Sequence, residues 1–301
     1  MYLLIKPLGS VAFRWGGVSS ILLSGSVSTG FFEPLPLPST IYGMLKYAYI
    51  INGLGQDAPS FKGPMFYTEG EGKVAVCVSL YPQSLYCNVE GKMRIVKIEE
   101  DLYERRIGIA LNRAAKTVKE GYIYMEKMLD LYALARMIIE EEPKRYGVLV
   151  EVNDDGEEKR KKLNGFIAPF GGEARPAVIT VEDDVKWSKV GKRLLASPAI
   201  IDWGNGSQVE WRANQSDKNS VKFKMIEGQL MKITRCCGHL RVKLEGIERI
   251  DKVTYRLISL GFDRNRRLPM MLALMPTVEI EGNYDAIGKY TERGWGSIIE
   301  L

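Results

Sequence analysis

Apolar residues in the first part of the chain follow the spacing of β-strands. The run Tyr2–Ile5 predicts a buried strand. The valine-rich segment Lys73–Tyr81, bounded by glycines and a proline, predicts a second. Residues 93–98 alternate between apolar and polar side chains after a turn at Glu90-Gly91. We therefore expect 93–98 to pair with 73–81 as a β-hairpin.

Two further segments have the spacing of amphipathic helices. The first follows the proline-rich FFEPLPLP, with Ser39 as its expected N-cap and Gly53 as its expected C-cap; its apolar face consists of Ile41, Met44, Leu45, Ala48 and Ile51. The second extends from Met125 to Glu142, although its start also fits a strand. The first helix follows a strand and a long glycine-containing loop, as at the start of a β-α-β unit.

The stretch YGVLVEVNDDGEEKRKKLNGFIAPF predicts two strands joined by a charged turn. The turn is centred on Asp154-Asp155-Gly156, and EEKRKK is expected to be its solvated tip. Two adjacent carboxylates can also bind a metal, but this setting favours a turn.

The composition changes near Glu182, where the chain becomes basic, apolar and glycine-rich. We therefore expect two domains, residues 1–182 and 183–301. Each half offers a few strands and one or two helices, including a strand over RLLASPAII in the second half. This pattern favours an α+β fold with antiparallel sheets over a doubly wound parallel sheet. No repeat of 20 to 50 residues is evident.

The overall charge gives little sign of a polyanion-binding surface. The chain has 301 residues, 46% of them hydrophobic, and a formal net charge of only +5. Binding to a polyanion therefore requires locally clustered cations. No secretory leader and no apolar run of membrane-spanning length is evident, so we expect a cytoplasmic protein without a membrane partner.

The cysteines predict a reduced protein. The four are Cys77, Cys87, Cys236 and Cys237, without paired C-x-x-C motifs. We expect structural thiols, no cofactor and no metal, although Cys236, Cys237 and His239 are a possible metal set. His239 is the only histidine, which restricts acid–base catalysis.

Several clusters place basic residues next to glycines. Arginine and closely approaching glycine backbone suit phosphate groups. The densest is RRIGIALNRAAKTVKEGYIY, with five basic residues and no acidic one between Arg105 and Lys119. A solvated loop would have the same composition. The other clusters are Arg14–Gly17, Gly171–Arg175, Arg264–Arg267 and Arg293–Gly296. No phosphate-binding loop, dinucleotide fingerprint, HExxH or GxSxG motif is present.

The order of these motifs resembles the repeat-associated mysterious protein (RAMP) superfamily of CRISPR systems, and within it the third subunit of the type III-B Cmr effector complex. The resemblance covers nearly the whole chain. It rests on five stretches, which are FEPLPLPSTIYGMLKYAYI, RIGIALNRAAKTVKEGYIY, GGEARPA, VTYRLISLGFDRNRRLPMMLALMPTVEIEG and the terminal GWG. The strand LMPTVEIEG departs from the family in lacking an alanine–glycine–serine run.

The resemblance implies two tandem ferredoxin-like (RRM-like) domains with antiparallel sheets. Residues 1–182 would carry an inserted β-hairpin, or thumb, around 104–124, and residues 183–301 a glycine-rich terminal loop. The thumb would wedge at the first guide position and turn a base outward.

The resemblance also implies a non-catalytic subunit that binds the 5′ handle of CRISPR RNA. Its protein partners would be the large palm-domain subunit and an adjacent RAMP backbone subunit. The expected RNA-binding residues are Arg14, Ser39, Lys46, Arg105, Arg106, Ile107, Gly108, Asn112, Arg113, Lys116, Lys119, Gly171, Gly172, Arg175, Arg266, Arg267 and Arg293.

Two alternatives remain open. One is a RAMP endoribonuclease that processes CRISPR RNA, in which His239 would be the only available imidazole. The other is a structural module that contacts only protein. Metal-independent cleavage of repeat RNA would favour the first, and absence of salt-dependent RNA binding would favour the second.

Overall fold

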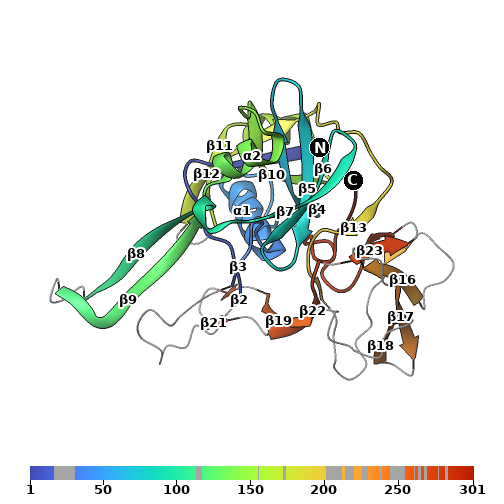
Figure 1. The fold of residues 1–301 in the computed structure, drawn as a ribbon. Coiled ribbons are helices and arrows are strands. Elements are labelled where there is room, and N and C mark those ends of the chain that lie inside the picture. Colours follow the sequence, from blue (N-terminus) through green and yellow to red (C-terminus); the bar gives the residue numbers. More distant parts are fainter. Residues whose placement is uncertain are drawn as a thin grey trace.

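A computed structural model provides the fold (Figure 1). It describes the chain except for residues 17–30, 113–116, 155, 172–173, 201–211, 214–219, 226–229, 237–238, 245–254, 261, 264–265, 268–269, 277 and 282–283.

The centre of the molecule is an eight-stranded sheet in the order β11-β12-β1-β10-β4-β5-β6-β7. Every neighbouring pair in it is antiparallel. The strands are β1 (Tyr2–Pro7), β4 (Phe61–Glu69), β5 (Val74–Leu80), β6 (Ser84–Val89), β7 (Lys92–Lys97), β10 (Arg145–Val152), β11 (Phe166–Phe170) and β12 (Arg175–Glu182).

The predicted pairing of 73–81 with 93–98 is wrong, because an additional strand separates them. β6 pairs with β5 on one side and with β7 on the other. The turn between β5 and β6 contains Pro82 and Gln83, which has a positive φ of 47°. This turn returns the chain directly after Tyr81, and the mixed sequence SLYCNV of β6 has no clear alternation.

The part of the chain that the structure describes has three α-helices, which are α1 (Pro38–Ile51), α2 (Leu131–Ile139) and α3 (Glu157–Leu163). Leu3 and Ile5 of β1 share a hydrophobic core with Leu45 of α1 and Ile138 of α2. Leu4 belongs to a separate core on the opposite face. This alternation of side chains fixes which face of the sheet the helices α1 and α2 cover.

The start of α1 differs from the prediction. Leu37, not Ser39, is the N-cap, and no side chain caps the helix. Pro38 takes the first helical position, where its missing N–H costs nothing. At the other end the C-cap is Asn52 and not the expected Gly53, which follows it with a positive φ of 65°.

The segment Met125–Glu142 is part strand and part helix. Its start belongs to a strand ending at Leu129, which is the alternative that the sequence left open. Asp130 caps α2 by accepting hydrogen bonds from the backbone N–H groups of Tyr132 and Ala133.

The predicted charged hairpin tip EEKRKK is wrong, because these residues form α3. Glu157 and Glu158 lie in its first turn and basic residues in its last turn, which complements the helix dipole. Leu163 is buried beneath it. The strands before and after α3, β10 and β11, do not pair as a hairpin. In the sheet, β12 and β1 lie between them.

The elements β1, α1, β4, β5, α2 and β10 have the expected β-α-β-β-α-β order along the chain. β1 and β4 run parallel with β10 between them, and β10 and β5 run parallel with β4 between them. These are two split β-α-β units. In a ferredoxin-like sheet, however, the first strand lies next to the third, whereas β1 is next to β10 and β12. The connectivity is therefore present, and the ferredoxin-like strand order is not.

The second half contains short strands. A six-stranded sheet has the order β18-β17-β16-β23-β13-β25, and small sheets pair β14-β22-β19, β15-β24 and β20-β21. Within the described residues of 183–301 no helix occurs, and a ferredoxin-like domain there stays a prediction. The strands are β13 (Arg193–Leu195), β14 (Ala199–Ile200), β15 (Arg212–Ala213), β16 (Ser220–Met225), β17 (Leu230–Cys236), β18 (His239–Leu244), β19 (Tyr255–Ser259), β20 (Phe262–Asp263), β21 (Arg266–Arg267), β22 (Met270–Leu274), β23 (Val278–Glu281), β24 (Tyr284–Ala286) and β25 (Ile298–Glu300).

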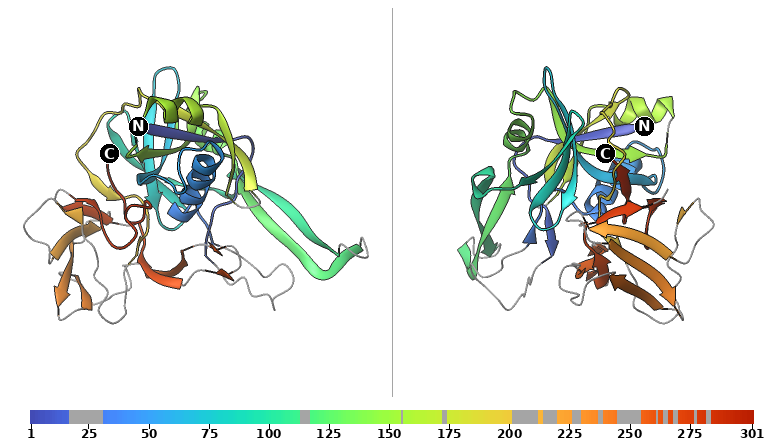
Figure 2. Two further views of the ribbon diagram at one scale, coloured as in Figure 1. Left: turned by 180° about the vertical axis from the view of Figure 1, so that it is seen from behind. Right: turned by 45° about the vertical axis from the view of Figure 1, so that its right-hand side comes forward.

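The two halves share one hydrophobic core on the second face of the central sheet. Leu4 and Met65 of the first half pack in the same cluster as Leu194, Ile299 and Leu301 of the second. The chain end consequently lies close to its start, as both views of Figure 2 show. The predicted strand over RLLASPAII is divided into β13 and β14.

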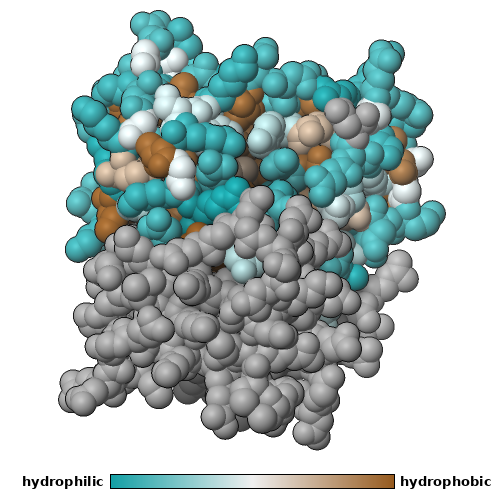
Figure 3. Space-filling model, turned by 90° about the vertical axis from the view of Figure 1, so that its right-hand side faces the viewer, coloured by the Kyte–Doolittle hydropathy of each residue, from teal (hydrophilic) through white to brown (hydrophobic). Residues whose placement is uncertain are grey.

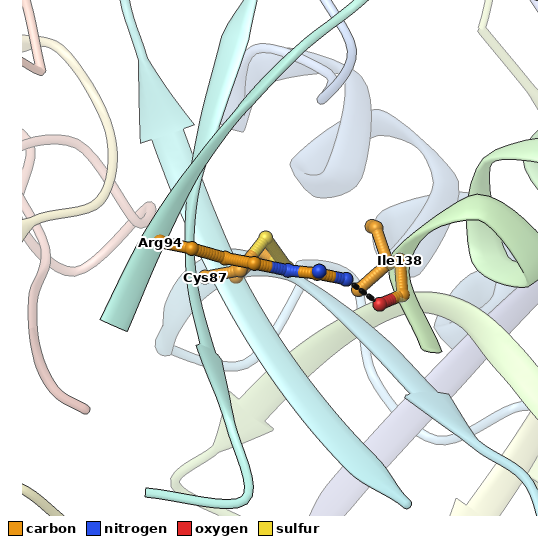
Figure 4. The surroundings of a disulfide bond; sticks show 4 residues. Cys87, Arg94 and Ile138 are labelled. Carbon is orange, nitrogen blue, oxygen red and sulfur yellow. Dashed lines mark hydrogen bonds between the residues drawn. A yellow bond between two sulfur atoms is a disulfide. The ribbon is translucent and has the colours of Figure 1, made fainter. Parts of the chain in front are cut away.

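A disulfide joins Cys77 to Cys87, so the expectation of reduced thiols is wrong at these two positions. The two residues lie directly opposite on β5 and β6, with Cα atoms 4.0 Å apart, and both are fully buried. The Arg94 side chain extends past the disulfide to donate a hydrogen bond to the carbonyl oxygen of Ile138 (Figure 4). The disulfide is therefore enclosed between the sheet and α2.

The described residues contain no group of histidine, cysteine and carboxylate side chains able to hold a metal ion. The sequence suggested Cys236, Cys237 and His239 as a possible metal set, and of these Cys237 lies outside the described residues. The same part of the chain has no helix long and apolar enough to cross a membrane. The described part of the face in Figure 3 is largely hydrophilic, with scattered apolar residues.

Candidate nucleic-acid interface

The densest basic segment forms a long β-hairpin, made of β8 (Tyr103–Asn112) and β9 (Thr117–Leu129). Its strands pair from Tyr103↔Leu129 to Asn112↔Thr117. The hairpin projects from the body of the molecule, as Figures 1 and 2 show. Residues 105–112 thus do not belong to the central sheet.

The base of the hairpin is fixed to the body by backbone hydrogen bonds and burial. Val11 and Leu129 exchange two backbone hydrogen bonds, of 3.0 and 2.6 Å. Leu102, Tyr103 and Met128 are buried there. Burial raises the pKa of the Tyr103 phenol, which therefore remains neutral. The hairpin is thus attached through an apolar, hydrogen-bonded base.

The two arginines at this base already contact carboxylates. Arg105 Nη2 lies 3.3 Å from Glu100 Oε2, and Arg106 Nη2 lies 2.8 Å from Glu104 Oε2. Hydrogen bonds from Lys127 and Arg105 lower the pKa of Glu100, and those from Arg106 and Ser10 lower that of Glu104. Ion pairs between side chains as exposed as these add little stability. A phosphate group can therefore replace the carboxylate as the partner of either arginine.

The turn between β11 and β12 lies against the same base. Gly171 has a φ of 71°, and a Cβ atom there would be 3.3 Å from the backbone oxygen of Ala12. Arg175 Nη2 is 3.7 Å from Met128 Sδ of β9. The Arg175 charge also helps to lower the pKa of Glu104. The structure thus places Arg106 and Arg175 near the same carboxylate, that of Glu104, with Gly171 in the adjoining turn. Arg105 contacts Glu100 instead.

Arg14 lies on a separate small ribbon, in which β2 (Arg14–Gly16) pairs with β3 (Phe31–Phe32). Its side chain is exposed, and Cζ is 5.4 Å from the centre of the Phe32 ring. The neighbouring Trp15 is buried and donates a 2.6 Å hydrogen bond to the carbonyl of Leu35. This buried tryptophan fixes the ribbon that presents Arg14.

Lys46 and Arg293 meet at the ring of Tyr42 on α1. Arg293 Cζ is 4.7 Å and Lys46 Nζ 5.7 Å from the ring centre. Ser39 also lies on α1, half-buried. Trp295, beside Arg293 in the GWG stretch, is only 2% exposed and packs in the core, which fits a structural and not a base-stacking role.

For several expected RNA-binding residues the structure describes only the backbone, and some lie outside the described residues. Arg266 and Arg267 form β21, which pairs with β20. Ile107, Gly108, Asn112 and Lys119 are placed on the hairpin strands by their register or range. Arg113, Lys116 and Gly172 lie outside the described residues.

Sequence reasoning missed the aromatic and acidic partners of these cations. Tyr42 lies four residues before Lys46 on α1, a spacing that indicates contact on a helix. By contrast, no local pattern connects Arg14 with Phe32, or Arg293 with Tyr42. Only the tertiary fold brings these pairs together.

The amino-acid sequence is similar to those of known CRISPR-associated proteins. Residues 87–199 match the family described as CRISPR-associated protein (Cas_Cmr3). Over 230 residues the chain is 28% identical to the CRISPR system CMR subunit Cmr3 of Saccharolobus solfataricus, covering 66% of this chain and 69% of that protein.

Two solved structures have a similar fold. One chain is in a cryo-EM structure of the type III-B Cmr-beta bound to cognate target RNA, and it matches with a TM-score of 0.52 at 21% identity over 93% of this chain and 86% of its own. The other is in the same assembly with target RNA and AMPPnP, with a TM-score of 0.52 at 20% identity and the same coverage. In sequence, the chain is therefore similar over part of its length to Cmr3 proteins of CRISPR systems.

Proposed function

We propose that this Cmr3-like protein is a non-catalytic, RNA-binding subunit of a type III-B Cmr effector complex in CRISPR defence. It binds the 5′ handle of CRISPR RNA in the cytoplasm. It docks on the large palm-domain subunit and on an adjacent RAMP backbone subunit. Its hairpin, β8 and β9, acts as the thumb at the first guide position.

The observation that carries this proposal is the projecting hairpin. Its segment from Arg105 to Lys119 has five basic residues and no acidic one. A ribbon that leaves the body can lie along a strand of RNA, and arginine suits its phosphates. Arg106, Gly171 and Arg175 at its base extend the cationic surface onto the body.

The test compares complexes purified from cells with two variants of equal charge. The first variant replaces four hairpin cations by glutamine, and the control replaces four exposed cations of β7, α2 and α3. The hairpin set is Arg105, Arg106, Arg113 and Lys116, and the control set is Lys92, Lys97, Arg136 and Lys161. Co-purifying RNA and protein subunits are quantified by sequencing and mass spectrometry.

We expect the hairpin variant to lose CRISPR RNA while the control retains it. Equal RNA content in both variants contradicts the proposed thumb. Metal-independent cleavage of repeat RNA by the purified protein, abolished by His239→Ala with an unchanged melting curve, would support the endoribonuclease instead. Absence of any RNA from the wild-type complex would support a protein-only module.

A further inference from the structure

The ring of Tyr42 contacts charged groups from two distant parts of the chain. Lys46 lies one turn further along α1, whereas Arg293 lies in the loop between β24 and β25. Their charged ends are 5.7 and 4.7 Å from the ring centre. Both distances are in the range of cation–π attraction. One aromatic side chain therefore contacts a cation from each of these two parts of the chain.

The orientation of this ring is fixed at its other end. The Tyr42 hydroxyl donates a hydrogen bond to Asp57 Oδ1, which also accepts one of 2.9 Å from the backbone N–H of Ala58. Lys46 Nζ is 3.4 Å from the same oxygen. The hydrogen bond from Tyr42 is the largest cause that lowers the pKa of Asp57, so this carboxylate stays charged near neutral pH.

The backbone that carries Arg293 is also fixed. The N–H of Phe61 donates a 3.3 Å hydrogen bond to the carbonyl of Glu292, and the N–H of Arg293 donates one of 2.9 Å to that of Tyr290. Gly294 follows with a φ of 79° and lies so close to the Phe61 ring that a Cβ atom would overlap it. The loop therefore presents Arg293 to α1 in one position.

Both cations remain accessible to a ligand. The side chains of Lys46 and Arg293 are 42% and 45% exposed. Their carboxylate partners, Asp57 and Glu292, lie 3.4 and 3.6 Å away and are 58% and 45% exposed. Such solvated pairs are weak, and a backbone phosphate, whose two non-bridging oxygens share one negative charge, can compete with them.

We propose that Tyr42 is a positioning residue that holds Arg293 and Lys46 together as one two-cation site for a backbone phosphate of the bound RNA. The inference rests on the proposed RNA-binding function and adds to it the residue that organises these two cations. Tyr42 itself does not touch the RNA, because its hydroxyl is engaged by Asp57 and its ring by the two cations.

The test measures binding of labelled single-stranded RNA of the repeat-derived 5′ handle to the assembled complex as a function of salt. Arg293→Ala is expected to weaken binding by about threefold to tenfold at low salt and to reduce the salt slope by about 0.7, the loss of one phosphate contact. Tyr42→Leu releases both cations and should weaken binding at least as much, whereas Tyr42→Phe keeps the ring and should remain within about twofold of wild type. The double variant Tyr42→Leu/Arg293→Ala should be no weaker than about the Tyr42→Leu variant alone, because loss of the ring already releases Arg293.

Tyr47→Leu is the matched control, an exposed tyrosine on the same helix that packs on Phe166 instead. It should leave both affinity and slope unchanged. Melting curves separate misfolding from lost positioning, and Tyr42→Trp, which retains a π face, should restore binding if the leucine variant is unstable. The proposal is overturned if Tyr42→Leu binds like wild type while Arg293→Ala does not, or if neither variant changes binding. A wild-type complex that does not bind the RNA would instead refute the proposed function.

Discussion

Cys77 and Cys87 are ten residues apart on neighbouring strands, and their pairing depends on the fold around them. Their spacing alone did not distinguish two thiols from a disulfide, because β6 had no clear strand pattern. Once β5 and β6 pair in register, the two cysteines lie opposite each other. The same holds for Tyr42 and Arg293, which only the tertiary fold joins.

We expect the purified protein to contain the Cys77–Cys87 disulfide and to keep it under mild reduction. Both residues are fully buried, so a water-soluble reductant has no access in the folded protein. Alkylation in denaturant without reductant, followed by intact mass measurement, should label at most two of the four cysteines. Prior reduction in denaturant should make all four available.

Replacing both cysteines with alanine should destabilise the protein by about 2–4 kcal/mol, since the crosslink restricts the unfolded chain. Thermal or urea unfolding measures the change. Labelling of all four cysteines in denaturant without reductant would contradict the disulfide.

At the scale of elements, the sequence predicted those whose signal is local. The spacing of Ile41, Met44, Leu45 and Ala48 predicted α1, and valine-rich 73–81 predicted β5, because burial of one face or strand imposes that pattern. It failed for α3, whose charged residues fit a solvated turn as well as a short helix. The order of strands in the sheet depends on non-local pairing and could not be derived from periodicity.

The terminal GWG loop should tolerate no side chain at its last glycine. Gly296 has a φ of 63°, and a Cβ atom there would overlap the carbonyl oxygen of Ile287. We expect Gly296→Ala to cost at least about 3 kcal/mol of folding free energy, measured by denaturant unfolding. Gly72→Ala is the control, because a Cβ atom at Gly72 would have no neighbouring atom within 4 Å and its φ is not positive. Equal stability of the two variants would show that this loop is not held as described.

On the hairpin, apolar and charged positions should contribute differently to RNA binding. Arg105, Arg106 and Ile107 are consecutive along β8. Removing the hairpin charges should weaken binding less at high salt, because screening has already reduced their contribution. Ile107→Ala should reduce the binding free energy by about 1–3 kcal/mol, because the contact with the displaced base is lost. This loss should depend little on salt. Titrations at several salt concentrations measure both effects, and identical salt slopes for the two variants would contradict separate roles.

At the scale of the molecule, most of the chain forms one framework for a few exposed cationic groups. The helices α1 and α2 pack on one face of the central sheet. Residues near the C-terminal end of the chain pack on the other face. This framework fixes the base of the hairpin, the Arg14 ribbon and the loop of Arg293. The modest net charge of +5 is thus compatible with RNA binding, because the cations are concentrated at these positions.

The central claim is that the hairpin of β8 and β9 lies on CRISPR RNA. The most direct measurement is photo-crosslinking of the assembled complex, with photoreactive nucleotides placed through the 5′ handle and first guide position. Crosslinked peptides are then identified by mass spectrometry. We expect crosslinks within residues 105–119 from nucleotides at the junction of handle and guide. Crosslinks elsewhere in the protein, with none in the hairpin, would contradict this claim.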